Sequence, residues 1–478
     1  MQSRVSDAYF TNFNSIVSRY AYKELYVRTL EYNQLPSYIE SAPAHITKDA
    51  LEFLSYKHAF SIPNDSVRQA LWTAYWKYAH PFIPVLDQIE MSKSIQGCGE
   101  KISLLLYQCV MLVGQLFLIA HEGPRGEFRD SQELFASIRA LYDLDWETRP
   151  LIILQALILM TFFPQKVTEP KGQAYFVRHA VSIAYNVGLH RDPTSFYSEA
   201  SVQHFRKRLW WSLFIRERTL LLDDGTPWMI DDTDYDVPMI EIDDFCLPDV
   251  CHNVGTQSPL VDVNCISRQR KIAIMWVERA KLAVIMGRLS PLSIRIPESN
   301  SSIAERPVLQ SGVAQFQKSL HDTAIALERW QRDVDPETDL DQLSSPASWA
   351  EDRELYLQCA TLKLLYHTVK FQLAVLLDLS KTPTQTVQFP RTRTRQEVNE
   401  SCNAIMQITK DLRLSGCTAH LPLYGTSVLR PVLIWAILNG VLGRHPRQAS
   451  GFNPLQFDIG RVDSYEFLFK AFILCDTE

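Results

Sequence analysis

The amino-acid sequence predicts an all-α fold: a large multi-helix array with little or no sheet. Only 17 of its 478 residues are glycine, so tight turns and positive-φ positions are few, which favours long helices over many short strands. Hydrophobic residues make up 46% and charged residues 21%, which is typical of a globular chain and not of a disordered one. At this length, two or three packed subdomains are expected.

We divide the chain into four parts by its helical patterns and polar breaks. Residues 1–65, with stretches such as LPSYIESAPAH, are expected to form an arm, and residues 66–290 a helical core. Residues 291–312 are expected to form a loop, and residues 313–478 a C-terminal helical subdomain packed on the core. The last residues, SYEFLFKAFILCDTE, stop inside an apolar helical pattern, which we interpret as a chain that lacks its end.

The first long helix is predicted over residues 66–80. Leu71, Tyr75 and Tyr78 fall on one side at helical spacing, and Pro81 then stops the helix. Two apolar segments follow, residues 102–120 and 151–163. The first is nearly long enough to span a membrane, but Ser103, Gln108 and Gln115 dilute it, so we interpret both as buried core helices and expect no membrane.

The segment GQAYFVRHAVSIAYNVGLHRDP carries a helix and its C-terminal cap. Apolar residues recur at intervals of three and four from Ala174 to Ala184. Gly188 stands where the helix ends, Leu189 where the next apolar contact is made, and Pro193 just beyond. This order predicts a glycine C-cap.

Residues 204–222 (HFRKRLWWSLFIRERTLLL) are apolar on every side of the predicted helix, which indicates burial. The same helix carries six charged side chains: Arg206, Lys207, Arg208, Arg216, Glu217 and Arg218. Buried charges need partners. Eight aspartates follow within about two dozen residues: Asp223, Asp224, Asp231, Asp232, Asp234, Asp236, Asp243 and Asp244. We therefore predict that this acidic stretch folds back on the helix, and that Arg216 and Arg218 do not both point to bulk water.

Further helices are predicted towards the C-terminus. Their ranges are residues 271–289, 313–333, 353–379, 397–412 and 425–443.

The chain has a net charge of −6, whereas a surface that binds phosphates is usually basic, so any contact with DNA is expected to be indirect or through another module. Its nine cysteines are odd in number and widely spread, which indicates reduced thiols and not a disulfide framework. The first residues lack the pattern of a secretory signal.

Several of these segments together resemble a known family. AVSIAYNVGLHRDP, FRKRLWWSLFIRERTLLL, GTPWMIDDTDYDVP and IDDF resemble the fungal-specific transcription factor domain, the middle homology region of regulators with binuclear zinc-cluster fingers. The likeness is closest to the cutinase transcription factor group and strongest over residues 35–290. The chain departs from it in two places: Glu217-Arg218 stands where relatives commonly have Asp-Arg, and Gly225-Thr226-Pro227 where they tend to have Gly-Arg-Pro.

The resemblance implies a regulator of transcription in the nucleus, acting on metabolic or secondary-metabolite genes. It also implies a homodimer or a heterodimer with a related regulator, and a small-molecule effector. Zinc is expected only in the DNA-binding module, and residues 1–97 hold no cysteine, so this chain lacks that module. Either the coding region is truncated or the protein works without the module. The alternative is a stand-alone ligand-binding or protein-interaction adaptor that modulates a full-length regulator.

No motif for catalysis is present, so we predict no enzyme and no catalytic residue. The spacing of Cys246, Cys251, His252 and Cys265 matches no common zinc site, and His179 and His190 are interpreted as structural. The basic patch at 204–208 is expected to be neutralised by the acidic stretch and not to bind nucleic acid. Candidate ligand or regulatory residues, with a scaffold role first and a sensing role second, are Arg206, Arg208, Trp210, Trp211, Arg216, Arg218, Asp231 and Asp234.

Overall fold

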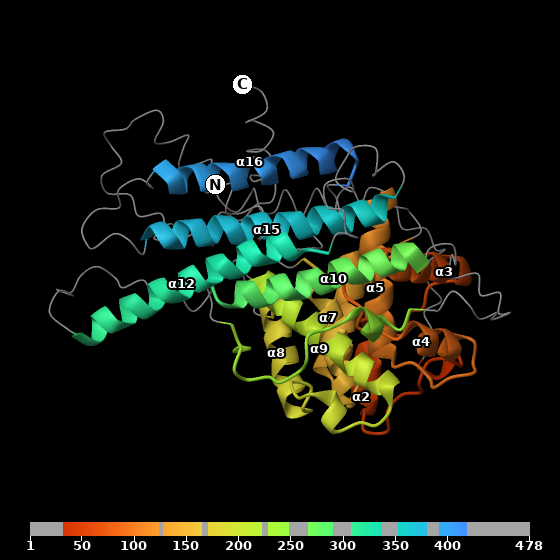
Figure 1. Cartoon of the computed structure of the whole chain (residues 1–478). Helices are drawn as coiled ribbons and strands as arrows, with labels where there is room; N and C mark the ends of the chain where they lie inside the picture. The colour runs from red at the N-terminus through yellow and green to blue at the C-terminus, as the bar shows by residue number, and fades with distance from the viewer. Residues whose placement is uncertain are drawn as a thin grey trace, which may run out of the picture.

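Helices make up the architecture of this protein (Figure 1). The computed structural model describes residues 32–123, 128–164, 171–221, 228–247, 266–289, 307–335, 352–379 and 392–417. Within these ranges there is no strand, and an isolated β-bridge joins Ile39 and Ile102. The predicted all-α class is confirmed.

The described residues form α-helices, short 3-10 helices and one π-helical turn. In order they are η1 (Tyr32–Gln34), α2 (Lys48–Tyr56), α3 (Asp65–Ala74), η2 (Tyr75–Ala79), α4 (Gln88–Ile95), α5 (Leu104–Glu122), α6 (Ser131–Asp143), α7 (Pro150–Met160), α8 (Gln173–Asn186), η3 (Pro193–Ser195), α9 (Ala200–Leu221), η4 (Ile242–Phe245), α10 (Ile266–Gly287), α12 (Pro307–Asp333), α15 (Arg353–Leu379) and α16 (Thr392–Leu414). Many of them begin at a polar cap. The side chains of Thr47, Asn64, Asp87 and Asp130 each accept a hydrogen bond from a backbone N–H in the first turn of the next helix.

Helix α5 forms the centre of the larger core. Its residues from Leu104 to Ile119 are all buried, between α3 with η2, α6 and α7. By length and composition α5 is apolar enough to cross a membrane, yet 89% of that stretch is buried inside the helical body. The interpretation as a core helix is confirmed.

Two glutamines of α5 tie it to the chain around it. Gln108 Nε2 donates to the carbonyls of Ala59 and Ser61, at 3.0 and 2.9 Å. Gln115 Nε2 donates to the carbonyl of Arg129 and to Ser131 Oγ, at 2.7 and 2.8 Å. The polar residues that interrupt the apolar segment therefore satisfy buried backbone groups.

The last part of the predicted arm packs into the same core. Tyr38, Ile39, Leu54 and Phe60 belong to the hydrophobic cluster built around α5. The buried Arg129 side chain donates to the carbonyls of Lys57 and His58 at the end of α2, which fixes α2 against α6. The three boundaries between the four parts of the chain stay predictions.

The predicted helix over residues 66–80 differs in its last turn. It runs as α3 to Ala74 and continues as the π-helical turn η2, which ends with the His80 N–H bonded to the Tyr75 carbonyl at 2.8 Å. The wider turn admits one more residue, and Leu71, Tyr75 and Tyr78 are all buried.

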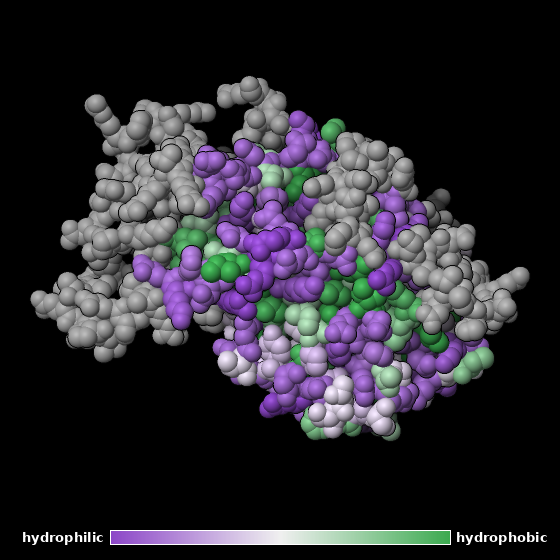
Figure 2. Space-filling model, viewed as in Figure 1, coloured by the Kyte–Doolittle hydropathy of each residue, from purple (hydrophilic) through white to green (hydrophobic). Residues whose placement is uncertain are grey.

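Helices α10, α12, α15 and α16 form a second body above the first (Figure 1). Helix α10 contributes to both cores, α15 lies between α10 and α16, and α12 extends beyond the rest. α12 begins at Pro307, inside the expected loop and before the predicted start at 313, and α16 begins at Thr392 instead of 397. The predicted helix at 425–443 lies outside the described residues. Polar side chains cover much of the described surface on the face shown in Figure 2.

Candidate functional site

Helix α9 is the element around which the candidate residues gather. It packs against α7, α8, α10 and η4. Its apolar residues Leu209, Trp210, Trp211, Leu213, Phe214 and Ile215 are all buried, although they point to different sides of the helix. The predicted burial of an all-round apolar helix is confirmed, and the charged side chains of α9 must therefore find partners inside the protein.

Arg206 and Arg216 bind the C-terminal ends of two neighbouring helices. Arg206 Nη2 donates to the carbonyl of Val187, the residue that caps α8, at 3.0 Å. Arg216 Nε and Nη2 donate to the hydroxyl and carbonyl oxygens of Thr161, which caps α7, both at 2.8 Å. A positive charge at a helix C-terminus is stabilised by the helix dipole and satisfies an unpaired carbonyl.

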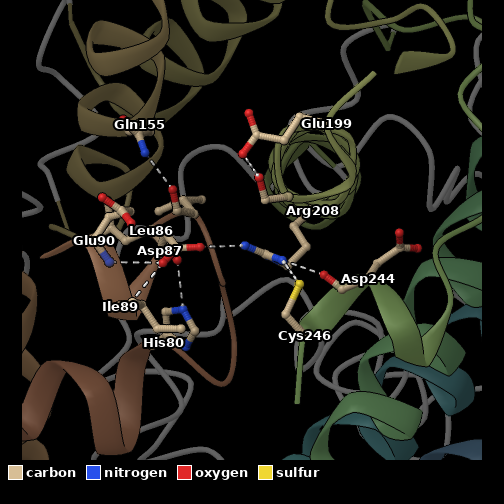
Figure 3. A network of polar contacts seen from close by, with 12 residues as sticks. His80, Leu86, Asp87, Ile89, Glu90, Gln155, Glu199, Arg208, Asp244 and Cys246 are labelled. Atoms are coloured by element: carbon tan, nitrogen blue, oxygen red, sulfur yellow. Dashed lines mark hydrogen bonds and ion pairs between the residues drawn. The ribbon is translucent and has the colours of Figure 1, made fainter. Parts of the chain in front are cut away.

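Arg208 joins three separate segments (Figure 3). Its guanidinium lies 3.5 Å from Asp87 Oδ2, donates to the Asp244 carbonyl and contacts Cys246 Sγ at 3.8 Å. The other carboxylate oxygen of Asp87 caps α4 by accepting from the N–H groups of Ile89 and Glu90. Arg208 therefore connects α9 to the start of α4 and to the end of η4.

Asp244, the last acidic residue of the stretch, is the main partner of the basic patch on α9. Its carboxylate pairs with Lys207 Nζ at 2.6 Å and with His204 Nδ1 at 2.8 Å, and it is only 3% exposed. It also accepts from the Glu241 N–H, which completes a capping box at η4. The acidic stretch therefore pairs with Lys207 and His204 of the basic patch, whereas the carboxylate next to Arg208 is that of Asp87 and the partner of Arg206 is the Val187 carbonyl.

Glu217 and Arg218 form a buried ion pair of 2.6 Å near the end of α9. Glu217 Oε1 also accepts from the N–H groups of Met229 and Ile230, so it holds the returning loop to α9. Burial raises the pKa of Glu217, and Arg218 together with these two backbone N–H groups partly opposes that rise. Arg218 Nη2 in turn donates to the Ile230 carbonyl at 2.9 Å.

The Arg218 guanidinium is enclosed on three sides. It lies 4.4 Å from the ring centre of Phe214 and 4.9 Å from that of Trp228, a cation–π arrangement. On the third side Gly287 of α10 leaves the space, since a Cβ there would lie 3.0 Å from Arg218 Nε. Asp232 Oδ1 lies 3.5 Å from Arg218 Nη2. Burial raises the pKa of Asp232, and the charge of Arg218 opposes that rise.

Four aromatic rings gather on the side of α9 that faces the returning loop. Tyr235 lies 5.5 Å from the ring centres of Trp210 and Phe214 and 6.0 Å from that of Trp211. Trp211 Nε1 donates to the Pro238 carbonyl at 2.9 Å. Trp210 also packs edge-on against Tyr185 of α8, so the rings join α8, α9 and the loop.

The predicted return of the acidic stretch onto α9 is confirmed, and neither Arg216 nor Arg218 points to bulk water. Among the described residues the pairing aspartates are Asp232 and Asp244. The candidates Asp231 and Asp234 are exposed, and Asp231 accepts hydrogen bonds from the Thr233 N–H and hydroxyl instead, which lowers the pKa of Asp231. Asp223 and Asp224 lie outside the described residues.

Three partners of α9 were not singled out from the sequence: Asp87, Thr161 and Gly287. Asp87 is 121 residues from Arg208 and Thr161 is 55 residues from Arg216, so no local pattern joins them.

The predicted glycine cap at the C-terminal end of α8 is confirmed. Gly188 has φ of +64° and the buried Leu189 donates its N–H to the Ala184 carbonyl.

The described residues contain no group of three or more side chains able to hold a metal ion. Cys251, His252 and Cys265 lie outside the described part, and Cys246 is an exposed free thiol. The predicted structural histidine His179 contacts Tyr142 Oη with its Nδ1.

The chain matches the sequence model of a protein family, the fungal specific transcription factor domain, over residues 72–332. This range is more than half of the chain and includes all of α9 and its partners in the first core. No solved structure matches the chain.

Several relatives are similar over long stretches. Cutinase transcription factor 1 beta of Fusarium vanettenii is 27% identical over 85% of this chain and 48% of its own length. Transcription factor cpaR of Aspergillus oryzae is 27% identical over 81% of this chain and 66% of its own length. The acetamidase regulatory protein of A. oryzae is 26% identical over 39% of this chain. The chain thus spans about half the length of the cutinase factor that it matches.

Proposed function

Since the chain belongs to the fungal-specific transcription factor domain family, we propose that it is the regulatory domain of a transcription regulator. The observation that carries the proposal is the family match over the helices that build the α9 site. Relatives that match most of the chain are named transcription factors, which further supports a regulator and not an enzyme.

In this proposal the domain sets the activity of a DNA-binding module and does not grip DNA itself. The charge distribution supports this division. The chain has a net charge of −6, and the cations of the 204–208 patch are engaged by Asp244, Asp87 and the Val187 carbonyl. A side chain held in such pairs is not available to neutralise phosphates. Zinc belongs, in this proposal, to the DNA-binding module and not to the helical domain.

The names of relatives suggest the target genes. One relative is named for cutinase, another for acetamidase and a third for the regulation of ABC transporters. We therefore propose nuclear action on metabolic genes, including those of secondary metabolism. Association with a second copy or with a related regulator is part of the same proposal, as is control by a small-molecule effector.

The test is to tether the full chain to a heterologous DNA-binding domain in a fungal cell with a matching reporter gene. We expect the fusion to change reporter expression relative to the DNA-binding domain alone, in a way that depends on growth conditions. A fusion that is intact and nuclear but leaves the reporter at the control level under every carbon and nitrogen source contradicts the proposal.

A promoter-binding assay tests the division of labour. The purified chain alone is expected to leave a promoter fragment unshifted at 150 mM salt, and to alter the shift caused by a zinc-cluster relative. A salt-dependent shift by the chain alone would show that it contacts DNA directly.

A further inference from the structure

The two helical bodies of this protein have separate apolar cores. One hydrophobic cluster surrounds α5, and two smaller clusters lie among α10, α12, α15 and α16. None of the described residues of α12, α15 and α16 belongs to the cluster around α5. Helix α10 serves both bodies, with Trp276 and Ala280 in the first core and Met275 and Leu282 in the second. Local opening in proteins occurs at boundaries of this kind.

Beside α10, the segment that follows η2 connects the two bodies. Its Phe82 packs against the first core and also against the cluster between α15 and α16. The Phe82 carbonyl accepts from Trp276 Nε1 at 3.1 Å, and the Phe82 ring centre lies 5.1 Å from the Arg279 guanidinium. Since Trp276 and Arg279 both belong to α10, Phe82 lies where α10, η2 and the second body meet.

Charged side chains at the start of α15 add a second connection. Residues 352–354 each bind a different element, and we refer to them as the α15 junction. Asp352 accepts from Arg268 Nε and Nη2 of α10, at 2.5 and 3.3 Å. Glu354 lies 3.4 Å from Lys77 Nζ of η2 and 2.8 Å from Arg268 Nη2. The start of α15 is therefore bound to α10 and to the first core at once.

Arg353, the middle residue of the α15 junction, holds the end of α16. Its Nη2 donates to the Ser415 carbonyl at 2.8 Å, and its Nε contacts Cys417 Sγ at 3.1 Å. Gly416, between these two partners, has φ of +68°, and a Cβ there would lie 3.0 Å from Arg353 Nη2. Glycine permits both the backbone conformation and the close approach. The junction thus fixes α15 and α16 together.

The ion pairs of the α15 junction are partly shielded from water. The side chains of Arg268, Asp352 and Glu354 are 23%, 28% and 15% exposed, so salt screens them less than a surface pair. Burial alone would raise the pKa of Asp352, but the hydrogen bonds from Arg268 and from the Leu355 N–H bring that pKa below its ordinary value. The partners therefore stabilise Asp352 as an anion.

We propose that α12, α15 and α16 form a unit that opens while the first core stays folded, and that the α15 junction holds this unit closed. The contact between Lys77 and Glu354 crosses the boundary and is lost on opening. Opening uncovers apolar side chains such as Met275 and Leu362, which are fully buried in the closed form. A change of charge at the junction is thereby converted into exposure of an apolar surface.

This inference goes beyond the proposed function and does not depend on it, because it concerns how the chain opens and not what the chain regulates. Native-state hydrogen exchange of the purified full chain, followed by mass spectrometry at increasing low concentrations of urea, tests it. We expect peptides of α12, α15 and α16 to lose protection through one common opening while peptides of α5 and α7 remain protected. If peptides of both bodies lose protection together at every urea concentration, the inference is overturned.

Glu354→Gln tests the α15 junction itself. It removes the charge that faces Lys77 and Arg268, and exchange in α15 and α16 should become about tenfold faster with no change in α5. The matched control is Glu400→Gln on α16, whose partner Lys370 lies 3.9 Å away at the surface, and which should stay within about twofold of the parent chain. Equal acceleration in α5 and α15, or equal effects of the two variants, contradicts the role of the junction.

A substitution in the first core gives the most specific readout. Lys77→Met leaves every residue of α12, α15 and α16 in place, yet it should speed exchange in α15 about threefold and leave α5 unchanged. Lys93→Met removes an exposed ion pair with Glu90 in the same core and should speed exchange in neither helix. If the two lysine variants behave alike, the contact between η2 and α15 does not hold the unit closed.

Discussion

Glu217 and Arg218, consecutive residues of α9, form a 2.6 Å ion pair in which their side chains are 0% and 1% exposed. A charge in the interior is tolerated when it is paired and hydrogen-bonded, and both conditions are met here. Glu217 accepts from the Met229 and Ile230 N–H groups, and Arg218 donates to the Ile230 carbonyl. The ion pair therefore holds the loop to α9 at Met229 and Ile230.

Removing one partner of this pair should destabilise the protein strongly. Arg218→Ala leaves Glu217 buried without its counter-charge, which is expected to lower the free energy of unfolding by about 3–5 kcal/mol. Urea unfolding followed by circular dichroism measures this. The matched control is Arg191→Ala, whose partner Asp236 is 3.7 Å away on the surface, and which should cost less than about 1 kcal/mol. Equal effects of the two variants would contradict the importance of the buried pair.

Asp244 is expected to matter far more than the aspartate beside it. Asp244→Ala removes the acceptor of Lys207 and His204 and the cap of η4, so it should lower the free energy of unfolding by about 2–3 kcal/mol. Asp243→Ala changes an exposed carboxylate and should stay within about 0.5 kcal/mol of the parent chain. Limited proteolysis should cut residues 241–247 faster only in Asp244→Ala; cleavage at the same rate in both variants would count against this role.

The sequence predicts those features of α9 that depend on neighbours along the chain. Burial follows from apolar residues on all sides, and the cap at Gly188 follows from the order glycine, leucine and proline. The identity of the partners does not follow, because helix packing decides it. Arg216 caps α7 at Thr161, and Arg208 reaches Asp87, across separations of 55 and 121 residues. A pattern that counts nearby aspartates identifies Asp232 and Asp244 but cannot tell them from Asp231 and Asp234.

Close approach of α3 to α5 requires a glycine at position 114. A Cβ on Gly114 would lie 2.2 Å from the Leu71 carbonyl oxygen, a backbone atom that cannot move without shifting α3. We expect Gly114→Ala to lower the free energy of unfolding by at least about 2 kcal/mol, despite the better helix propensity of alanine.

Gly287→Ala is the comparison variant for this prediction. There the new Cβ meets Arg218 Nε and Nη2 at 3.0 Å, and this guanidinium, paired with Glu217 and enclosed by Phe214 and Trp228, has to shift by a few tenths of an ångström. The variant should therefore lose less stability than Gly114→Ala, whose Cβ meets a backbone atom at 2.2 Å, because the gain in helix propensity offsets part of the displacement. Thermal and urea unfolding of both variants decide the matter, and a Gly114→Ala chain as stable as Gly287→Ala would mean that the two helices are not in close contact.

His80, which follows η2, should make stability depend on pH. Burial, helped by the charge of Arg208, lowers the pKa of His80 to about 4, although the bond to the Leu86 carbonyl and the charge of Asp87 oppose the change. The folded chain therefore keeps His80 neutral at a pH at which the unfolded chain, with a histidine pKa near 6.5, takes up a proton. The contribution of His80 to the free energy of unfolding is therefore fully present above about pH 6.5 and is lost as the pH drops towards 4.

Between pH 7 and pH 5 this single group should account for about 2 kcal/mol of the free energy of unfolding. His80→Gln keeps a donor for the Leu86 carbonyl but does not titrate, so the difference between the two pH values should shrink by that amount. His321→Gln, an exposed site on α12, should leave the difference as it is in the parent chain. His367, whose pKa burial also lowers to about 4, keeps part of the dependence in the His80 variant. If His80→Gln leaves the pH dependence unchanged, His80 is not held neutral between η2 and Arg208.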